Sequence, residues 1–71
     1  MSLKQLKVNE SGTIVGLGGD HREAAKLIAL GVLPGLRVKL VQRTPSYVFE
    51  IGHSQFAVDA AIASQILVER T

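Results

Sequence analysis

The segment Leu30-Gly-Val-Leu-Pro-Gly35 separates two parts of the chain that have different hydrophobic periods. Before it, apolar residues recur at helical spacing, and after it they alternate every second residue, as in a β-strand. Gly31 can adopt the left-handed conformation that ends a helix, and Pro34 prevents the helix from resuming. The segment therefore predicts a helix over residues 21–30 that stops at Gly31 and is followed by a strand.

The start of this helix is marked by capping residues. Asp20 is the expected N-cap, and Glu23 three residues later completes an Asp-x-x-Glu version of the capping box. One face of the helix is predicted to be apolar and another to face solvent. These faces carry, respectively, Ala24, Leu27 and Ile28, and Arg22, Lys26 and Ala29. We expect Val32 to pack back on Leu27 beyond the glycine.

Five short strands are predicted around this helix. They cover residues 12–17, 36–43, 47–51, 55–58 and 65–69, and a short helical turn at 60–64, capped by Asp59, precedes the last strand. Three consecutive strands are joined by hairpin-length links, which excludes a parallel α/β architecture. The pattern predicts a mainly β fold, a small and partly open barrel of about five strands with one inserted helix.

Length and composition limit the chain to one domain over residues 1–71. It has 71 residues, 46% hydrophobic and 20% charged, which is a globular composition, and it has no cysteine for disulfides or thiolate metal sites. The apolar run 27–36 is shorter than the about 20 residues that span a membrane, and glycine and proline interrupt it. The first residues, Met1 to Leu6, show no apolar segment followed by a cleavage site, so we expect no secretory signal. We therefore expect a cytoplasmic protein without direct membrane insertion.

No catalytic constellation is present in the sequence. Hydrolases need a nucleophile, a base and an orienting group in one cleft, and nothing marks such a set here. Gly16-Leu-Gly-Gly19 precedes the helix, but the dinucleotide-binding pattern would need glycine where His21 stands. Asp20 would also place a carboxylate where a phosphate should bind. We expect a non-enzymatic protein with no catalytic residues and no bound cofactor.

The two histidines, His21 and His53, are candidate metal ligands. Together with Asp20, Glu23 or Asp59 they would form a weak divalent-metal site if the fold brought them together. His21 and Glu23 are two residues apart and so do not share a helix face. We therefore assign no metal ligand and expect both histidines to face solvent.

Arg37, Lys39 and Arg43 lie on one face of the second predicted strand. Such a stripe is typical of a nucleic-acid or acidic-partner surface. The chain has only one tyrosine and two phenylalanines, none of them on this strand, and its net charge is +2. Base stacking is therefore unsupported, and a solvated outer face is favoured, with no nucleic acid as partner. RNA binding remains a third alternative, which strong salt dependence would support.

Val32, Leu33 and Pro34 form an unusually apolar connection, which we call the apolar tip. Connections are normally polar and run over the surface. Two interpretations are open: the tip docks into a partner, or both aliphatic residues cover the core beneath the helix. Of the two, Leu33 is expected to be the more exposed.

Several segments together resemble the FeoA family. They are the opening Leu3-x-x-Leu6, the strand at Gly12, the helix end Leu30-Gly-Val-Leu-Pro-Gly35, and the closing Phe56-Ala-Val-Asp59 and Ala63-x-x-Ile66-x-Val68. The resemblance covers nearly the whole chain, and the helix-terminal L-G-x-x-P-G is its most specific part. It implies an SH3-like β-barrel with an inserted helix. It also implies a cytoplasmic accessory protein of bacterial ferrous iron uptake that works with FeoB, a membrane transporter with a GTP-hydrolysing cytosolic domain.

The resemblance suggests a docking surface and an alternative function. We expect Val32, Leu33 and Pro34, with Arg37 and Lys39 beside them, to bind the cytosolic face of FeoB. The same module forms the C-terminal domain of iron-dependent repressors of the diphtheria toxin repressor type. A metal-responsive regulatory module is therefore the alternative, although this chain has no room for the repressors' DNA-binding and dimerisation regions. The sequence departs from the family at Ala57-Val58-Asp59, where relatives often carry a basic residue after Ala-Leu. Exposed strand edges in so small a barrel also allow self-association.

Overall fold

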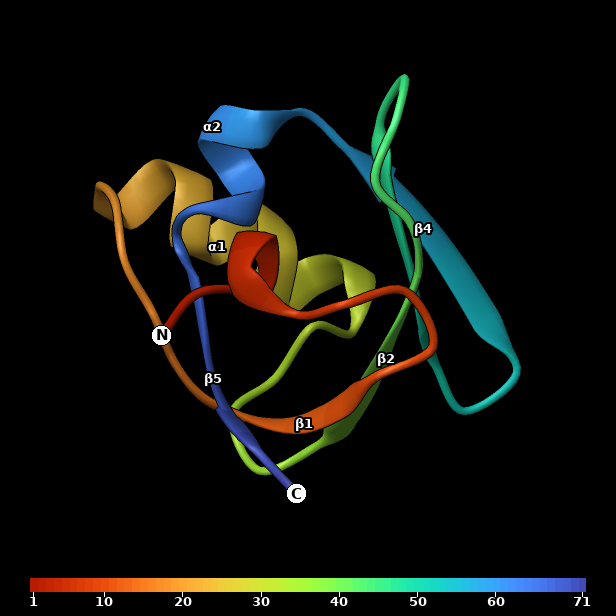
Figure 1. Cartoon of the computed structure of the whole chain (residues 1–71). Helices are drawn as coiled ribbons and strands as arrows, with labels where there is room; N and C mark the ends of the chain where they lie inside the picture. Colours follow the sequence, from red (N-terminus) through yellow and green to blue (C-terminus); the bar gives the residue numbers. More distant parts are fainter.

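Alternating apolar residues build one five-stranded antiparallel sheet, which curls into a small barrel (Figure 1). The strand order is β4-β3-β2-β1-β5 in this computed structural model, which describes all 71 residues. Along the chain the elements are η1 (Leu3–Gln5), β1 (Ser11–Leu17), α1 (His21–Leu30), β2 (Arg37–Gln42), β3 (Tyr47–Ile51), β4 (Ser54–Val58), α2 (Ala60–Ala63) and β5 (Ile66–Arg70). The predicted mainly β fold with one helix and a short helical turn is confirmed. None of its helices combines the length and the apolar character needed to cross a membrane.

The core is formed by side chains that point into the barrel. In β2 the predicted alternation is confirmed, since Val38 and Leu40 are buried while Arg37 and Lys39 are exposed. Leu36 was expected to point inward with them but is 36% exposed, because it precedes β2 and belongs to the connecting turn. The buried hydrophobic residues are Leu3, Leu6, Ile14, Leu27, Val32, Val38, Leu40, Phe49, Ala63, Ile66 and Val68.

The N-terminal segment is part of the core, which the strand and helix patterns did not predict. Leu3 and Leu6 flank a single 3-10 turn, η1, and both are fully buried. The carbonyl of Met1 accepts a hydrogen bond from the N–H of Val68, and Ser2 forms an isolated bridge with Leu67. The first residues therefore cover the outer edge of β5.

Helix α1 begins and ends where the capping signals predict. The carboxylate of Asp20 accepts the backbone N–H of Glu23 at 2.8 Å. Gly31 has a φ of 100°, and the N–H of Val32 donates to the carbonyl of Leu27 at 2.9 Å, which closes the helix. Leu27 is the buried residue of α1, whereas Ile28, expected on the same inward face, is 48% exposed. The helix therefore meets the core along a narrow strip only.

Candidate docking surface

The connection between α1 and β2 is a tight, hydrogen-bonded turn. Pro34 and Gly35 occupy its two central positions, Gly35 has a φ of 95°, and the N–H of Leu36 donates to the carbonyl of Leu33 at 3.3 Å. This is the geometry of a type II turn, which favours proline and then glycine at these positions. Two further backbone bonds fix the turn to β1. The N–H of Gly35 donates to the carbonyl of Ile14 at 2.7 Å, and the N–H of Ile14 donates to the carbonyl of Leu36 at 2.9 Å.

The two aliphatic residues of the apolar tip have different environments. Val32 is fully buried and belongs to the same core cluster as Leu27, so its predicted packing beneath the helix is confirmed. Its side chain is therefore unavailable to a partner in this conformation, and the expected five-residue surface loses this member. Leu33 is 39% exposed and Pro34 is exposed. Val32 thus anchors the turn to the core, and Leu33 and Pro34 form its outer side.

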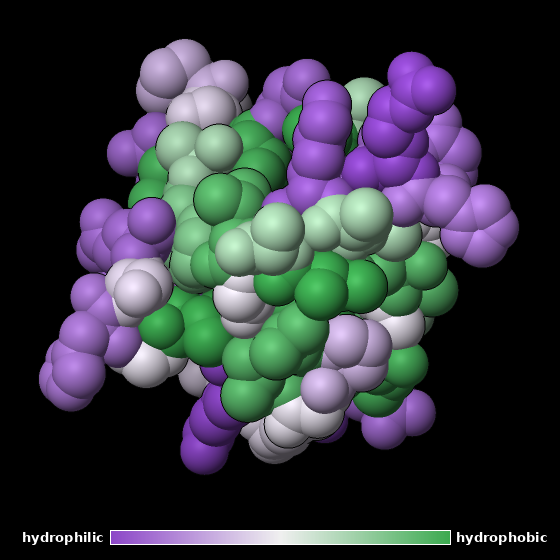
Figure 2. Space-filling view, turned by 180° about the vertical axis from the view of Figure 1, so that it is seen from behind, coloured by the Kyte–Doolittle hydropathy of each residue, from purple (hydrophilic) through white to green (hydrophobic).

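Three further apolar side chains, two on α1 and one in the turn before β2, are exposed and were not predicted to be. Ile28 is 48% exposed, Leu30 62% and Leu36 36%. Apolar residues form a broad area across the face that is seen from behind in Figure 2. Exposed apolar area of this kind marks interaction surfaces more often than isolated exposed residues do. The one sequence feature that could have indicated this exposed apolar area is Leu30, which is apolar, ends the helix and lies outside the predicted inward face.

A groove lies between α1 and the end of β4. Its volume is about 450 Å³, and five of its eight lining residues are hydrophobic. They are Leu27, Leu30, Ala57, Val58 and Ile62, and the other three are Glu23, Lys26 and Asp59. The groove could therefore accept apolar side chains, with charged groups at its border.

Arg37 and Lys39 project from the outer face of β2. They line a shallow hollow of about 380 Å³ together with Ser11, Val38, Glu50 and Gly52. Lys39 lies opposite Glu50 in the register between β2 and β3. The two basic residues therefore follow the turn in sequence but face a hollow of their own, which contains a carboxylate as well.

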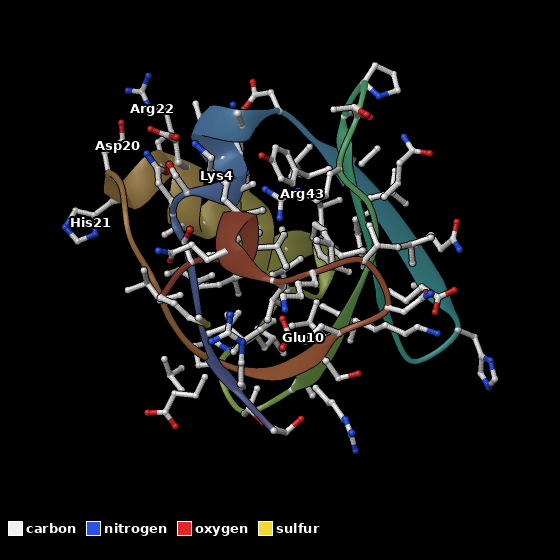
Figure 3. The ribbon with its side chains drawn as sticks, in the orientation of Figure 1. Lys4, Glu10, Asp20, His21, Arg22 and Arg43 are labelled. Atoms are coloured by element: carbon white, nitrogen blue, oxygen red, sulfur yellow. The ribbon has the colours of Figure 1, made fainter.

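Arg43 does not continue this basic stripe. Its guanidinium donates to the carbonyl of Leu6 at 2.6 Å and stands over the ring of Tyr47 at 5.7 Å (Figure 3). Arg43 follows the end of β2, and the register between β2 and β3 shifts between Leu40 and Gln42. The expected alignment of three basic residues on one strand face is therefore wrong, because this irregularity turns the third residue toward the N-terminal segment.

The candidate metal ligands are not brought together. His21 lies with Asp20 and Arg22 at the start of α1, well away from Glu10 and Arg43 (Figure 3). His53 lies in the turn between β3 and β4, at an exposed position. Nowhere in the chain do three or more histidine, cysteine, aspartate or glutamate side chains gather as a metal-binding group. His21 and His53 are therefore not members of one such group.

The glycine-rich segment before α1 is a turn, as predicted. The N–H of Gly18 donates to the carbonyl of Gln65 at 2.7 Å, and Gly19 has a φ of 81°. A Cβ on Gly19 would collide with the side chain of Gln65. These glycines allow close contact with the segment before β5, and the bonded N–H of Gly18 is not free to bind a phosphate.

Known structures share this fold over its whole length. A crystal structure of an iron uptake regulatory protein, FeoA, has a TM-score of 0.90 and 21% identity, and covers 100% of this chain and 96% of its own. An FeoA of Stenotrophomonas maltophilia, solved with zinc and described as an SH3 domain protein, has a TM-score of 0.84 and 22% identity, covering 97% and 89%. A manganese-dependent transcriptional repressor with manganese has a TM-score of 0.91 and 14% identity, covering 100% and 36%.

The comparison with protein-family models identifies the chain independently of these structures. No curated protein sequence matched it. The model of the FeoA domain matches residues 1–70, which is all but the last residue. The SH3-like barrel, the inserted helix and this match agree, and the chain belongs to the FeoA domain family.

Proposed function

We propose that this chain is a small, non-enzymatic accessory protein of bacterial ferrous iron uptake, located in the cytoplasm. It binds the cytosolic face of an FeoB-type transporter and shifts that transporter between conformations. The family match over residues 1–70 supports a role in ferrous iron transport. The observation that carries the docking mechanism is the rigid turn that presents Leu33 and Pro34 at the surface.

The proposed docking surface has Leu33 and Pro34 at its centre, and Arg37 and Lys39, which follow in β2 and line a separate hollow, extend it. Backbone bonds to Ile14 already hold the turn, so little conformational entropy is lost on binding. An adaptor of this kind changes the transporter's equilibrium only if it binds one of the transporter's conformations more tightly than the other. Val32 contributes by fixing the turn from below, not by contact.

A charged substitution at the centre of the surface tests this proposal. Leu33→Asp should lower affinity for the soluble domain of the transporter at least about tenfold, because it places a carboxylate in an apolar contact. Leu67→Asp is the matched control, since Leu67 lies on β5 and is 40% exposed, against 39% for Leu33. The two substitutions should therefore cost the fold a similar amount. Equal affinity of both variants would reject Leu33 as a docking residue.

The alternative is a metal-responsive regulatory module. The similarity to a manganese-dependent repressor and to a zinc-bound FeoA favours it, but at these identities that similarity concerns the fold. The absence of a metal-binding group of side chains counts against it. Titration of the chain alone with ferrous, manganese or zinc ions separates the two functions. A saturable, stoichiometric site at His21 or His53 would favour the regulatory module.

A further inference from the structure

The two edge strands of the sheet are protected differently. The outer edge of β5 is covered by residues 1–2, and the strand carries Glu69 and Arg70. The sheet ends at β4, which lies at the right margin of Figure 1 and pairs only with β3. Its sequence, Ser-Gln-Phe-Ala-Val, has no charge and no proline, and its register with β3 has no bulge. Charges, prolines and bulges are the usual means of preventing an edge strand from pairing, and β4 has none of them.

The hairpin geometry shows which backbone groups of β4 are free. Ile51 pairs with Ser54 across the two-residue turn Gly52–His53, so the backbone N–H and C=O groups of these two residues bond to each other. Bonded pairs alternate along an antiparallel ladder. The N–H and C=O groups of Gln55 and Ala57 therefore point away from β3. Both residues are exposed, and no other backbone bond occupies these groups.

We infer that a second copy of this chain pairs with β4 as an antiparallel strand, about a two-fold axis at Phe56. This register matches the full length of both strands, because Ser54 of one copy then lies opposite Val58 of the other. Gln55 and Ala57 of one copy exchange N–H···O=C bonds with Ala57 and Gln55 of the second copy. All of the free backbone groups of β4 are satisfied in this arrangement.

Side chains complement one another in the same register. One residue beyond each end of the paired strands, Asp59 of one copy lies opposite His53 of the other, and the symmetry repeats this pair. An imidazole then lies opposite a carboxylate at both ends of the interface. Phe56, already stacked on Phe49 with ring centroids 5.3 Å apart, lies beside its symmetry mate. Two facing strands of five residues make a small interface, so the dimer is weak and depends on concentration.

Sedimentation equilibrium of the whole chain over micromolar to millimolar concentrations tests the inference without any transporter. Its result is therefore independent of the proposed docking function. The average mass should rise from that of one copy toward that of two. Ala57→Pro removes a free N–H and should raise the dimer dissociation constant at least about tenfold, since proline is tolerated on the solvent side of an edge strand. Ala57→Ser retains the N–H and should leave the constant unchanged within about twofold.

The charge at the ends of the interface provides a second test that does not depend on proline. His53→Glu places two carboxylates opposite each other and should weaken the dimer about fivefold, whereas His53→Lys should not weaken it. In NMR spectra of the unmodified chain, the amides of Gln55 and Ala57 should shift most with concentration. A chain that stays monomeric at about 1 mM would overturn the inference. Equal dimerisation of folded Ala57→Pro, or concentration-dependent shifts that leave β4 unaffected, would also overturn it.

Discussion

Truncation of two neighbouring residues, Val32 and Leu33, distinguishes the anchored side of the turn from its exposed side. Side-chain size alone makes Leu33→Ala the costlier change, because it removes three carbons where Val32→Ala removes two. Burial should reverse this order. Val32 is fully buried, so two carbons at about 0.8 kcal/mol each and about 1 kcal/mol for the remaining cavity give about 2.5 kcal/mol. Leu33 is 39% exposed and leaves no closed cavity, which scales its loss to about 1.4 kcal/mol.

Urea unfolding followed by circular dichroism measures both losses. A domain of this size has a denaturant slope of about 1 kcal/mol/M, so the midpoints should fall by about 2.5 M and about 1.4 M. Val32→Ala should therefore be the less stable variant, although it removes fewer atoms. If Leu33→Ala lost as much stability as Val32→Ala or more, Leu33 would be a core residue. The exposed apolar tip, and the docking role proposed for it, would then be rejected.

Three further predictions concern local interactions of the barrel. Gly35→Ala should cost about 1–2 kcal/mol in thermal or urea unfolding from backbone strain alone, since Gly35 has a φ of 95° and no atom lies within 4 Å of an added Cβ. Asp59→Ala should cost about 1 kcal/mol by removing the α2 cap, whereas Asp59→Asn should retain nearly all of the stability. The N–H of Lys7, donated to the carboxylate at 2.9 Å, lowers the pKa of Glu10; desolvation opposes this shift, and the nearby Arg70 charge adds to it. The stability that Glu10 contributes is therefore full above the ordinary glutamate pKa and is lost as pH falls through the lowered value. In Glu10→Gln, the free energy of unfolding, measured by urea unfolding at several acidic pH values, should therefore fall less steeply as the pH is lowered.

Local signals in the sequence were sufficient for most of the fold. Asp20 and Gly31 mark the ends of α1 because caps depend on neighbouring residues only. The strands were predictable because alternate residues such as Val38 and Leu40 must face the same side. The turn at Pro34 was likewise encoded by a proline–glycine pair.

Features that depend on distant contacts were not predictable in this way. Leu3 and Leu6 have no strand or long-helix pattern, and they are buried because β5 and α2, at the other end of the chain, lie beside them. Arg43 fits the alternation of β2 in the sequence. The register shift before Gln42 instead turns its side chain toward the carbonyl of Leu6. Ile28 matched the inward face of α1, yet only a narrow strip of the helix meets the core.

The candidate site shows the same division between local and distant information. The stiffness of the turn and the exposure of Leu33 followed from its own residues. Val32 was expected both to pack on Leu27 and to lie on the docking surface, and it is buried, with its N–H bonded to the carbonyl of Leu27. The groove beside β4 did not follow from local residues, because Leu30 and Ile62 come together only when the barrel closes.

The most direct test of docking is an amide-resolved NMR titration of this chain with the soluble cytosolic domain of its own organism's FeoB, with and without nucleotide. Docking through the turn predicts saturable shifts centred on Leu33 to Lys39, with smaller changes on the exposed face of α1. It also predicts that nucleotide changes the affinity, because the adaptor must distinguish two conformations of its partner. Saturable shifts confined to another face of the barrel, or no shifts at about millimolar concentration of the domain, would contradict docking through this turn.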